Sequence, residues 1–507
     1  MEPDVTRTYQ KFETLWKVIS ALGRAAGKIQ WDQQVMMPKQ GGDMCAEELA
    51  ALEEIHHERM VDNELWRILC DLRHAASEGF LDSMQSANVR LALRDADRAR
   101  VIPVSLASDI ARQACIGEQV WEEAKGRNDF AMFAPHLAKM IKLKRAYARY
   151  LAADLKDLYT PLLQDYEPDF TAAEVTKLLS DLREQLTPLV ERVISMPQPD
   201  CSVLKKVYNA DGLHRLSQRV ISLMGFAGGE DSRLDVSAHP FCTGTLKDVR
   251  MTTRFVPEDG LEAFYSTLHE AGHGLYERNL PYDQAGMPVA SAVSLGVHES
   301  QSRFWEVLVG KSRSFLRYIF PELQNTFPDM LANENSDSLY RAFNAAQLTP
   351  IRVNADPLTY NLHIIVRVDL EPLLISGDLE VLALPEAWNR RFKELFGFTP
   401  SDDAHGSLQD THWSGGSFGY FGTYTLGNEL SCQLYEACHA AYPDLENHIA
   451  AGDLMPARHW LREHIHRHGS LYDAKTLIKK ATGKPLGCEA LMRFFKKRYE
   501  DVYQTSL

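Results

Sequence analysis

Apolar residues recur at intervals of three and four positions along much of the first 230 residues. This spacing places them on one face of an α-helix, and it is clearest in residues 46–60, 88–102 and 133–159. Strand-like runs with β-branched residues are confined to 232–240 and 247–255. The pattern therefore predicts a mainly α-helical fold with at most one small β-sheet.

Short loops connect the predicted elements. Glycine and proline gather in stretches that are neither long nor rich in serine, at residues 38–42, 225–229 and 414–422. We therefore expect one continuous body over residues 1–507. Within it, residues 1–230 are expected to form a helical half that covers a groove, and residues 231–507 to carry the candidate site.

The acidic balance of charge limits the partners of the protein. Lys and Arg number 55 against 69 Asp and Glu, which gives a net charge of −14 at pH 7 with His neutral. An acidic body repels phosphate backbones and anionic lipid, so we expect neither nucleic acid nor a membrane as a partner. The apolar runs are also far shorter than the ~20 residues of a membrane-spanning helix.

The cysteine pattern indicates a reducing compartment. Eight cysteines are scattered along the chain without a C-x-x-C pair, and the N-terminal segment has acidic residues but no apolar signal-peptide core. We therefore expect free thiols in a cytoplasmic protein, and no zinc site built from cysteine.

The most informative segment is residues 261–280, whose apolar positions have helical spacing and for which Asp259 is a candidate cap. His269 and His273 lie four residues apart, which puts both imidazoles on one face, about 6 Å apart along the axis. They can bind one zinc ion, while Glu270 lies beside it and can take a proton from water and return it to a leaving amine. H-E-x-x-H also occurs by chance, so two structural histidines are the alternative.

A hydrolytic zinc site needs a third protein ligand. Asn279 stands where one class of zinc proteases has a third histidine, so that class is excluded. Glu277 lies about 12 Å from His269 along the axis, too far to converge with both histidines, and is expected to be a surface charge. Glu299 on the next predicted helix can cross the open face and complete a set of two histidines and one glutamate.

The neighbours of Glu299 can orient its carboxylate. His298, Ser302 and Arg303 flank it in the sequence, although a surface ion pair is the alternative for Arg303. A second group of histidines, at positions 464, 466 and 468, is expected to be solvated because alternate residues point to different sides of a helix.

Six short motifs occur in the order of one known family. They are HPF at 239–241, DVRMT at 248–252, HEAGH at 269–273, HESQSR at 298–303, IRVNAD at 351–356 and GSLQDTHW at 406–413. With further similar segments near both ends, the chain resembles the carboxypeptidase Taq family over nearly its whole length. It departs from the family pattern at Pro357, where an acidic residue is usual, and at Gly422, where proline is common.

The resemblance implies a zinc carboxypeptidase that removes single residues from peptide C-termini with broad specificity, proline being disfavoured. It implies a nearly all-helical, zincin-like fold of the neurolysin type with a deep central groove, one zinc ion per chain and usually a homodimer. Cobalt can replace zinc, since both metals accept two imidazoles and a carboxylate.

A carboxypeptidase also needs a cation that recognises the terminal carboxylate. Arginine fits because its planar fork donates two parallel hydrogen bonds. By resemblance this role falls to Arg352, with Arg367 as the reserve candidate; a helical i, i+4 pair between Arg352 and Asp356 is the alternative. Arg250 beside Asp248 is expected to brace the groove.

The glycine-rich segment 409–427 can approach a substrate closely and supply donors to an oxyanion. His412 and Tyr420 are the candidate donors, with Gln409 or Asp410 orienting the loop. The alternative is that the aromatic residues only pack and the glycines only turn.

Two other functions stay open on the sequence. The same groove can serve an endo-acting zinc oligopeptidase, or the chain can be a catalytically silent peptide-binding scaffold. The four residues of the candidate zinc site argue against silence, because the base is not needed to hold a metal.

Overall fold

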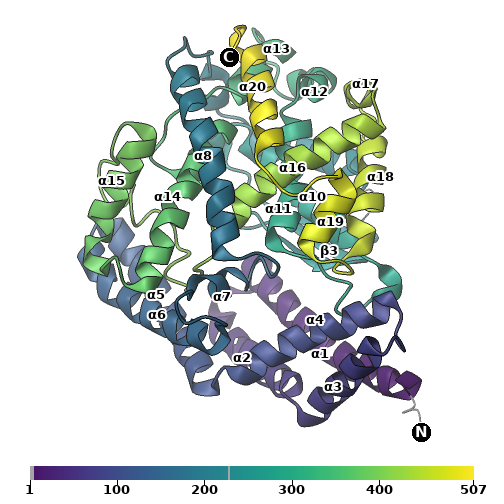
Figure 1. Cartoon of the computed structure of the whole chain (residues 1–507). Helices are drawn as coiled ribbons and strands as arrows, with labels where there is room; N and C mark the ends of the chain where they lie inside the picture. Colours follow the sequence, from purple (N-terminus) through teal and green to yellow (C-terminus); the bar gives the residue numbers. More distant parts are fainter. Residues whose placement is uncertain (1–4, 227–228) are drawn as a thin grey trace.

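The structure is a computed structural model that describes residues 5–226 and 229–507 (Figure 1). Its α-helices are α1 (Val5–Val35), α2 (Gly42–Met60), α3 (Asn63–Ser77), α4 (Ser83–Val101), α5 (Val104–Arg127), α6 (Phe130–Leu151), α7 (Tyr159–Leu163), α8 (Ala172–Ile194), α9 (Ala210–Leu223), α10 (Glu262–Arg278), α11 (Leu295–Arg303), α12 (Arg313–Thr326), α13 (Ser336–Phe343), α14 (Pro357–Ser376), α15 (Leu384–Phe396), α16 (Gly422–Ala441), α17 (Leu445–Ala450), α18 (Met455–His464), α19 (Ala474–Thr482) and α20 (Glu489–Tyr503). The predicted mainly helical fold is confirmed.

The helix predicted over residues 133–159 ends earlier than expected. α6 stops at Leu151, and a turn separates it from α7. In this turn the side chain of Asp154 accepts a hydrogen bond from the backbone of Lys156 (2.9 Å), and Asp157 accepts one from Thr160 (2.9 Å). Aspartate side chains that bond to nearby backbone groups compete with helix formation, which the apolar spacing alone does not reveal.

A single small sheet supports the helix that carries the histidines. β1 (Ser232–Val236) pairs in parallel with β3 (Asp248–Thr253), and β2 (Cys242–Thr245) pairs antiparallel on the other side of β3. The two predicted runs are β1 and β3. β2 was missed because it has only four residues and contains Gly244 at a φ of +80°, a conformation untypical of strands.

In the described part of the chain, two large hydrophobic cores hold the helices together, and a small third cluster packs Ala87 and Leu91 of α4 against Val289. The main core extends from Ala124 to Val502 and therefore crosses residue 230, the boundary suggested by the sequence. A smaller core lies between α1, α3 and α4 and receives Met287 from the main body. In Figure 1 these first helices (purple) lie below the rest of the molecule.

Polar contacts join the small helical group to the main body. The Asn88 side chain donates to Gln284 Oε1 (3.0 Å) and accepts from the backbone N–H of Val289 (2.9 Å). Arg98 pairs with Asp165 on the other side. The first helices are thus attached through a few specific contacts beside their own core.

The helix that carries Glu299 begins at a buried carboxyl group. Glu167 is 1% exposed and accepts a hydrogen bond from the backbone N–H of Gly296, in the first turn of α11. A Cβ atom at Gly296 would lie 2.8 Å from the Glu167 carboxyl, so the close approach requires glycine. Burial raises the pKa of Glu167 to about 8, although bonds from Ser294 and Gly296 oppose the shift.

We expect Glu167→Gln to gain stability relative to the parent as the pH rises. In the folded chain the pKa of Glu167, about 8, lies above the ordinary value of 4.5, so the parent loses stability between these two pH values. Glutamine does not ionise and escapes this loss. The free energies of unfolding from urea titrations should diverge across this window by at most about 1.4 kcal/mol per pH unit. A constant difference between pH 4.5 and 8 would contradict the buried, protonated carboxyl.

Candidate metal centre

Helix α10 begins later than the sequence suggested. Asp259 does not cap it, because this residue ends a 3₁₀ turn and Gly260, at a φ of +65°, turns the chain before the helix starts. The Asp259 carboxylate instead accepts a hydrogen bond from Arg254 (2.6 Å). The start of the helix is therefore fixed by backbone geometry, and its histidines lie in the middle of α10.

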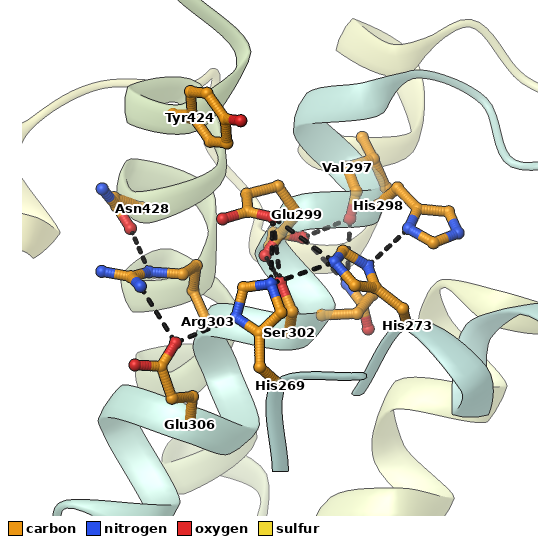
Figure 2. A network of polar contacts seen from close by, with 12 residues as sticks. His269, His273, Val297, His298, Glu299, Ser302, Arg303, Glu306, Tyr424 and Asn428 are labelled. Atoms are coloured by element: carbon orange, nitrogen blue, oxygen red, sulfur yellow. Dashed lines mark hydrogen bonds and ion pairs between the residues drawn. The ribbon is translucent and has the colours of Figure 1, made fainter. Parts of the chain in front are cut away.

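Two imidazoles and one carboxylate converge between α10 and α11. His269 Nε2 lies 3.2 Å from His273 Nε2, and Glu299 Oε2 lies 3.7 and 3.5 Å from these two nitrogens (Figure 2). Ligands at ~2.1 Å around a tetrahedral zinc ion are separated by about 3.4 Å, so the donor set fits this metal. Within residues 5–226 and 229–507 these three residues are the only such group of histidine, cysteine or acidic ligand atoms.

Two glycines allow α11 to lie close to its neighbours. A Cβ atom at Gly272, on α10, would lie 2.7 Å from the carbonyl oxygen of Gln301 and 2.7 Å from Cα of Ser302. A Cβ atom at Gly427, on α16, would lie 2.7 Å from Cβ of Glu299. Neither contact can be relieved without moving backbone or the ligand itself. The small residues therefore bring Glu299 within reach of the histidines.

We expect Gly272→Ala to weaken metal binding. The added methyl group meets the backbone of α11, so the helix must move away and take Glu299 with it. The expected cost is about 1–3 kcal/mol of stability, with at least about a tenfold loss of zinc affinity in competition with a chelator. Gly23→Ala is the control, because its Cβ atom meets nothing within 4 Å. Parental zinc affinity in Gly272→Ala would contradict the close approach.

The ring of His269 is oriented by a glutamate that the sequence analysis missed. α11 continues into a π-helical segment, Phe304–Gly310, from which Glu306 Oε2 reaches His269 Nδ1 at 2.9 Å. Arg303 and Lys311 also contact this carboxylate, at 2.9 and 3.3 Å. Burial alone would raise the pKa of Glu306, but the two cations hold it well below its usual range. Ionised Glu306 accepts a hydrogen bond from Nδ1–H of His269, and Nε2 of the neutral ring is then unprotonated and able to bind a metal.

Of the residues expected to orient Glu299, Ser302 contacts its carboxylate and Arg303 does not. Ser302 Oγ does contact the Glu299 carboxylate, at 3.1 Å. Arg303 is no surface charge, because its side chain is 12% exposed and donates from Nε to Asn428 Oδ1 (2.7 Å), and it braces Glu306 rather than Glu299. Burial raises the pKa of Glu299, but the two histidines and Arg303 lower it to about 2, so this ligand is ionised.

His298 faces His273, the second candidate histidine ligand. Its Nδ1 lies 2.6 Å from Nδ1 of His273, and its Nε2 lies 3.1 Å from Glu277 Oε1. Glu277 is therefore not the free surface charge that the helical spacing suggested; its side chain is 18% exposed. The spacing was correct for α10 alone, but α11 packs against this face and supplies His298 as a partner.

Glu270 lies in the interior beside the three ligands and is 7% exposed. Burial raises the pKa of its carboxyl to about 7, although the nearby imidazole of His269 opposes this shift. A carboxylate that holds a proton near neutral pH is suited to accept and return one.

Arg352 lies at the start of a 3₁₀ turn and is held by an aspartate. Its Nε and Nη2 donate to Asp410 Oδ1 at 3.0 and 2.8 Å, and Nη1 donates to Tyr360 Oη at 2.9 Å. Its backbone N–H donates to Gln409 Oε1 (2.8 Å). The alternative pair with Asp356 is wrong: no single helix spans the two residues, and Asp356 instead caps α14.

Arg367, the reserve candidate for substrate binding, cannot contact a substrate because it is 0% exposed. Its Nε donates to Asp410 Oδ2 at 2.6 Å, and Nη1 donates to the carbonyl oxygen of His363 at 2.6 Å. Burial raises the pKa of Asp410, but Arg367 and Arg352 together hold it well below its usual value. Arg367 thus supports Arg352 through their shared aspartate.

The glycine-rich loop gathers the candidate oxyanion donors in one aromatic cluster. The ring centres of His412 and Tyr420 are 5.2 Å apart, and His412 Nε2 lies 3.4 Å from the hydroxyl of Tyr424. Burial lowers the pKa of His412 to about 4, so its ring is neutral at pH 7. Buried Glu371 anchors the loop by accepting from the indole of Trp413 (2.7 Å).

The aromatic cluster also connects to the metal ligands. Tyr360, which the sequence analysis did not single out, lies between two arginines: the guanidinium of Arg303 is 5.3 Å from its ring, and Arg352 donates to its hydroxyl. Figure 2 shows Tyr424 on α16 near Glu299. Tyr424 lies in the glycine-rich segment 409–427 that the sequence singles out, whereas Tyr360 lies outside all of the motifs.

Asp248 and Arg250 lie at a cavity of about 660 Å³ between α1 and the β2–β3 hairpin. Arg250 donates from Nε to Asp248 (2.8 Å), and Lys28 of α1 pairs with the same carboxylate (2.7 Å). The Arg250 guanidinium also lies 4.5 Å from the ring centre of Trp31. These contacts link the first helix to the sheet.

The C-terminal histidines are not all solvated. His466 is 1% exposed; its Nε2 lies 2.9 Å from Gln301 Oε1, and its ring packs 5.3 Å from that of Tyr276. The prediction failed because His466 lies in a short 3₁₀ turn after α18 that directs it towards α10 and α11.

In the described part of the chain, no helix combines the length and apolar character needed to cross a membrane. All eight cysteines have free thiols.

A helical body in which H-E-x-x-H and a distant glutamate converge defines a metallopeptidase. Residues 11–499 match the family model of the carboxypeptidase Taq (M32) metallopeptidases, and the chain belongs to this family. It is therefore a metallocarboxypeptidase, a peptide hydrolase, and the resemblance inferred from the motifs is confirmed.

Known relatives match the chain from end to end. It is 37% identical over 503 residues to thermostable carboxypeptidase 1 of Thermus thermophilus, covering 97% of this chain and 98% of the relative. It is 33% identical to carboxypeptidase 1 of Bacillus subtilis, covering 98% and 99%. The crystal structure of the M32 carboxypeptidase from Deinococcus radiodurans superposes with a TM-score of 0.94 at 34% identity, covering 98% of this chain and 100% of that one.

Proposed function

We propose that this metallocarboxypeptidase releases single C-terminal amino acids from peptides, with one zinc ion held by His269, His273 and Glu299. The observation that supports this most is the convergence of these three ligand atoms within 4.8 Å of one another. We further propose broad specificity with proline disfavoured, and that cobalt can replace zinc.

Each catalytic task has a residue suited to it. A zinc ion at the three ligands supplies a Lewis acid that polarises the scissile carbonyl and acidifies the attacking water. The Glu270 carboxylate takes a proton from that water and later donates it to the amine of the departing amino acid. His412 and Tyr420 donate hydrogen bonds to the oxygen of the carbonyl under attack.

Arg352 fixes cleavage one residue from the end by binding the terminal carboxylate. A guanidinium has five N–H donors, and the contacts with Asp410 and Tyr360 use three of them, which leaves one N–H on each terminal nitrogen. Arg352, Arg367 and Asp410 together carry one net positive charge. This charge and the two free donors match a carboxylate.

We propose that the chain forms a single peptidase body and works in the cytoplasm as a homodimer. Its other partners are its peptide substrates. Residues 1–230 form the helical part that covers the groove, and residues 231–507 carry the catalytic groups. The separate core of α1, α3 and α4 supports a covering role for the first helices.

An endo-acting oligopeptidase and a silent scaffold remain the rival functions, and the family assignment argues against both. Incubating the zinc-loaded protein with a peptide and with its C-terminally amidated twin separates all three. We expect mass spectrometry to show a ladder of products, each shortened by one C-terminal residue, from the free peptide only. Internal fragments from both peptides would indicate an endopeptidase, and no cleavage of either would indicate a scaffold.

A further inference from the structure

The two histidines of the proposed metal site differ in the side chain that contacts Nδ1 of the ring. His269 contacts a carboxylate directly, at Glu306, whereas His273 contacts a second imidazole. Figure 2 shows the ring of His298 next to His273, joined to it by a dashed line. Behind His298 lies Glu277, one turn after His273 on α10, with Oε1 at 3.1 Å from His298 Nε2.

When His273 binds a metal, only one arrangement of protons is possible along the series of hydrogen bonds from His273 through His298 to Glu277. His273 Nε2 faces Glu299 and His269, so it must be unprotonated when it binds a metal, and the ring proton is then on Nδ1. His273 Nδ1–H donates to His298 Nδ1, which must accept. A neutral His298 consequently has its proton on Nε2 and donates it to Glu277.

Packing against other aromatic rings holds the imidazoles of His273 and His298 in place. Measured between ring centres, His298 lies 4.5 Å from His273 and 5.5 Å from Tyr276, and Tyr276 also packs 5.3 Å from His466. The backbone carbonyl of Glu277 accepts a hydrogen bond from Leu246 N–H (2.9 Å), which ties this end of α10 to the β2–β3 hairpin.

We propose that Glu277 is a positioning residue of the metal centre, which acts on His273 through His298. As the last acceptor of the chain, it keeps the His298 proton on Nε2 and so keeps His298 Nδ1 available to His273. Without it, His298 can carry its proton on Nδ1, where two N–H groups would face each other at 2.6 Å and displace the His273 ring. This inference rests on the proposed metal site.

Metal affinity and a cobalt spectrum test the proposal without using activity. Glu277→Leu removes the acceptor, and Glu277→Gln keeps an oxygen that can still accept. In competition with a chromophoric chelator we expect Glu277→Leu to bind zinc about 10–100-fold more weakly than the parent. The visible absorption spectrum of the cobalt-loaded Glu277→Leu variant should differ from that of the parent. In Glu277→Gln we expect both the zinc affinity and the cobalt spectrum to be close to those of the parent.

Glu277 and Asp248 both line the cavity between α1 and the β2–β3 hairpin, so Asp248 offers a control carboxylate. The Asp248 carboxylate contacts Arg250 and Lys28 rather than a histidine of the proposed metal site. We therefore expect the Asp248→Asn variant to bind zinc with the affinity of the parent. If Glu277→Leu fails to fold, Glu277→Asp replaces it, because the shorter side chain withdraws the acceptor while keeping the charge.

Two different failures can be told apart. Parental zinc affinity and an unchanged cobalt spectrum in Glu277→Leu, or in Glu277→Asp where that variant replaces it, would overturn the positioning role and leave the metal site intact. A parent protein that binds neither zinc nor cobalt would overturn the metal site itself, and the positioning role with it.

Discussion

Replacing Glu270 by glutamine is expected to lower kcat by about 10³-fold while zinc stays bound. Glutamine has nearly the same shape, but its amide cannot take a proton from water or return one to the leaving amine. The three ligands, His269, His273 and Glu299, are unchanged by this substitution. Steady-state kinetics and the zinc content after dialysis measure the two properties separately.

Glu446→Gln is a matched control for this experiment. Glu446 is a half-buried glutamate on α17 that accepts a hydrogen bond from Ser314 (2.6 Å) and has no partner among the proposed site residues. We expect it to keep the parental kcat. A Glu270→Gln enzyme that cleaved peptides at the parental rate would show that another group moves the proton.

Replacing Arg352 by alanine is expected to abolish most of the preference for a free C-terminus. Arg352 offers two unused N–H donors and lies in a cluster with one net positive charge, so its loss affects only substrates that carry a terminal carboxylate. A pair of hydrogen bonds to a charged group is worth roughly 3 kcal/mol, or about 100-fold in kcat/KM. The measurement is the ratio of kcat/KM for a free peptide to that for its amidated twin.

The ratio makes this test independent of a general loss of activity. Damage to the fold would lower both rates together and leave the ratio unchanged. We expect Arg352→Lys to keep part of the preference, because a lysine retains the charge without the planar fork. An equal loss on both peptides in Arg352→Ala would remove Arg352 from the role of carboxylate anchor.

The helical fold and the closeness of His269 and His273 could be anticipated because they follow from local patterns. Helical spacing of apolar residues gave α2 and α4, and the four-residue interval put His269 and His273 on one face of α10. Glu299 required more: its approach depends on Gly272 and Gly427, small residues whose importance appears only when the helices are packed.

The residues that surround the proposed metal ligands could not be anticipated, because their positions depend on how the helices pack. Glu306 lies within the π-helical segment Phe304–Gly310 that follows α11, and the spacing of apolar residues does not predict that this segment carries its carboxylate to His269. Glu277 and His466 were expected on the surface because a helix considered alone has solvent on its polar side. Packing of α11 and of the turn after α18 buries both against the site.

Arg367 illustrates the opposite error. A cation fifteen residues after Arg352 is as suitable as Arg352 itself when only residue types are compared. In the structure it is completely buried on α14, where it neutralises Asp410 from behind. The sequence therefore identified two arginines that share an aspartate but could not tell which of them is completely buried.

The most direct test of the account is an anomalous X-ray difference map from crystals of the zinc-loaded protein. We predict one strong peak per chain, about 2.1 Å from Nε2 of His269, from Nε2 of His273 and from the carboxylate of Glu299. A peak at another position, or a map in which the Glu299 side chain points away from the two imidazoles, would contradict it.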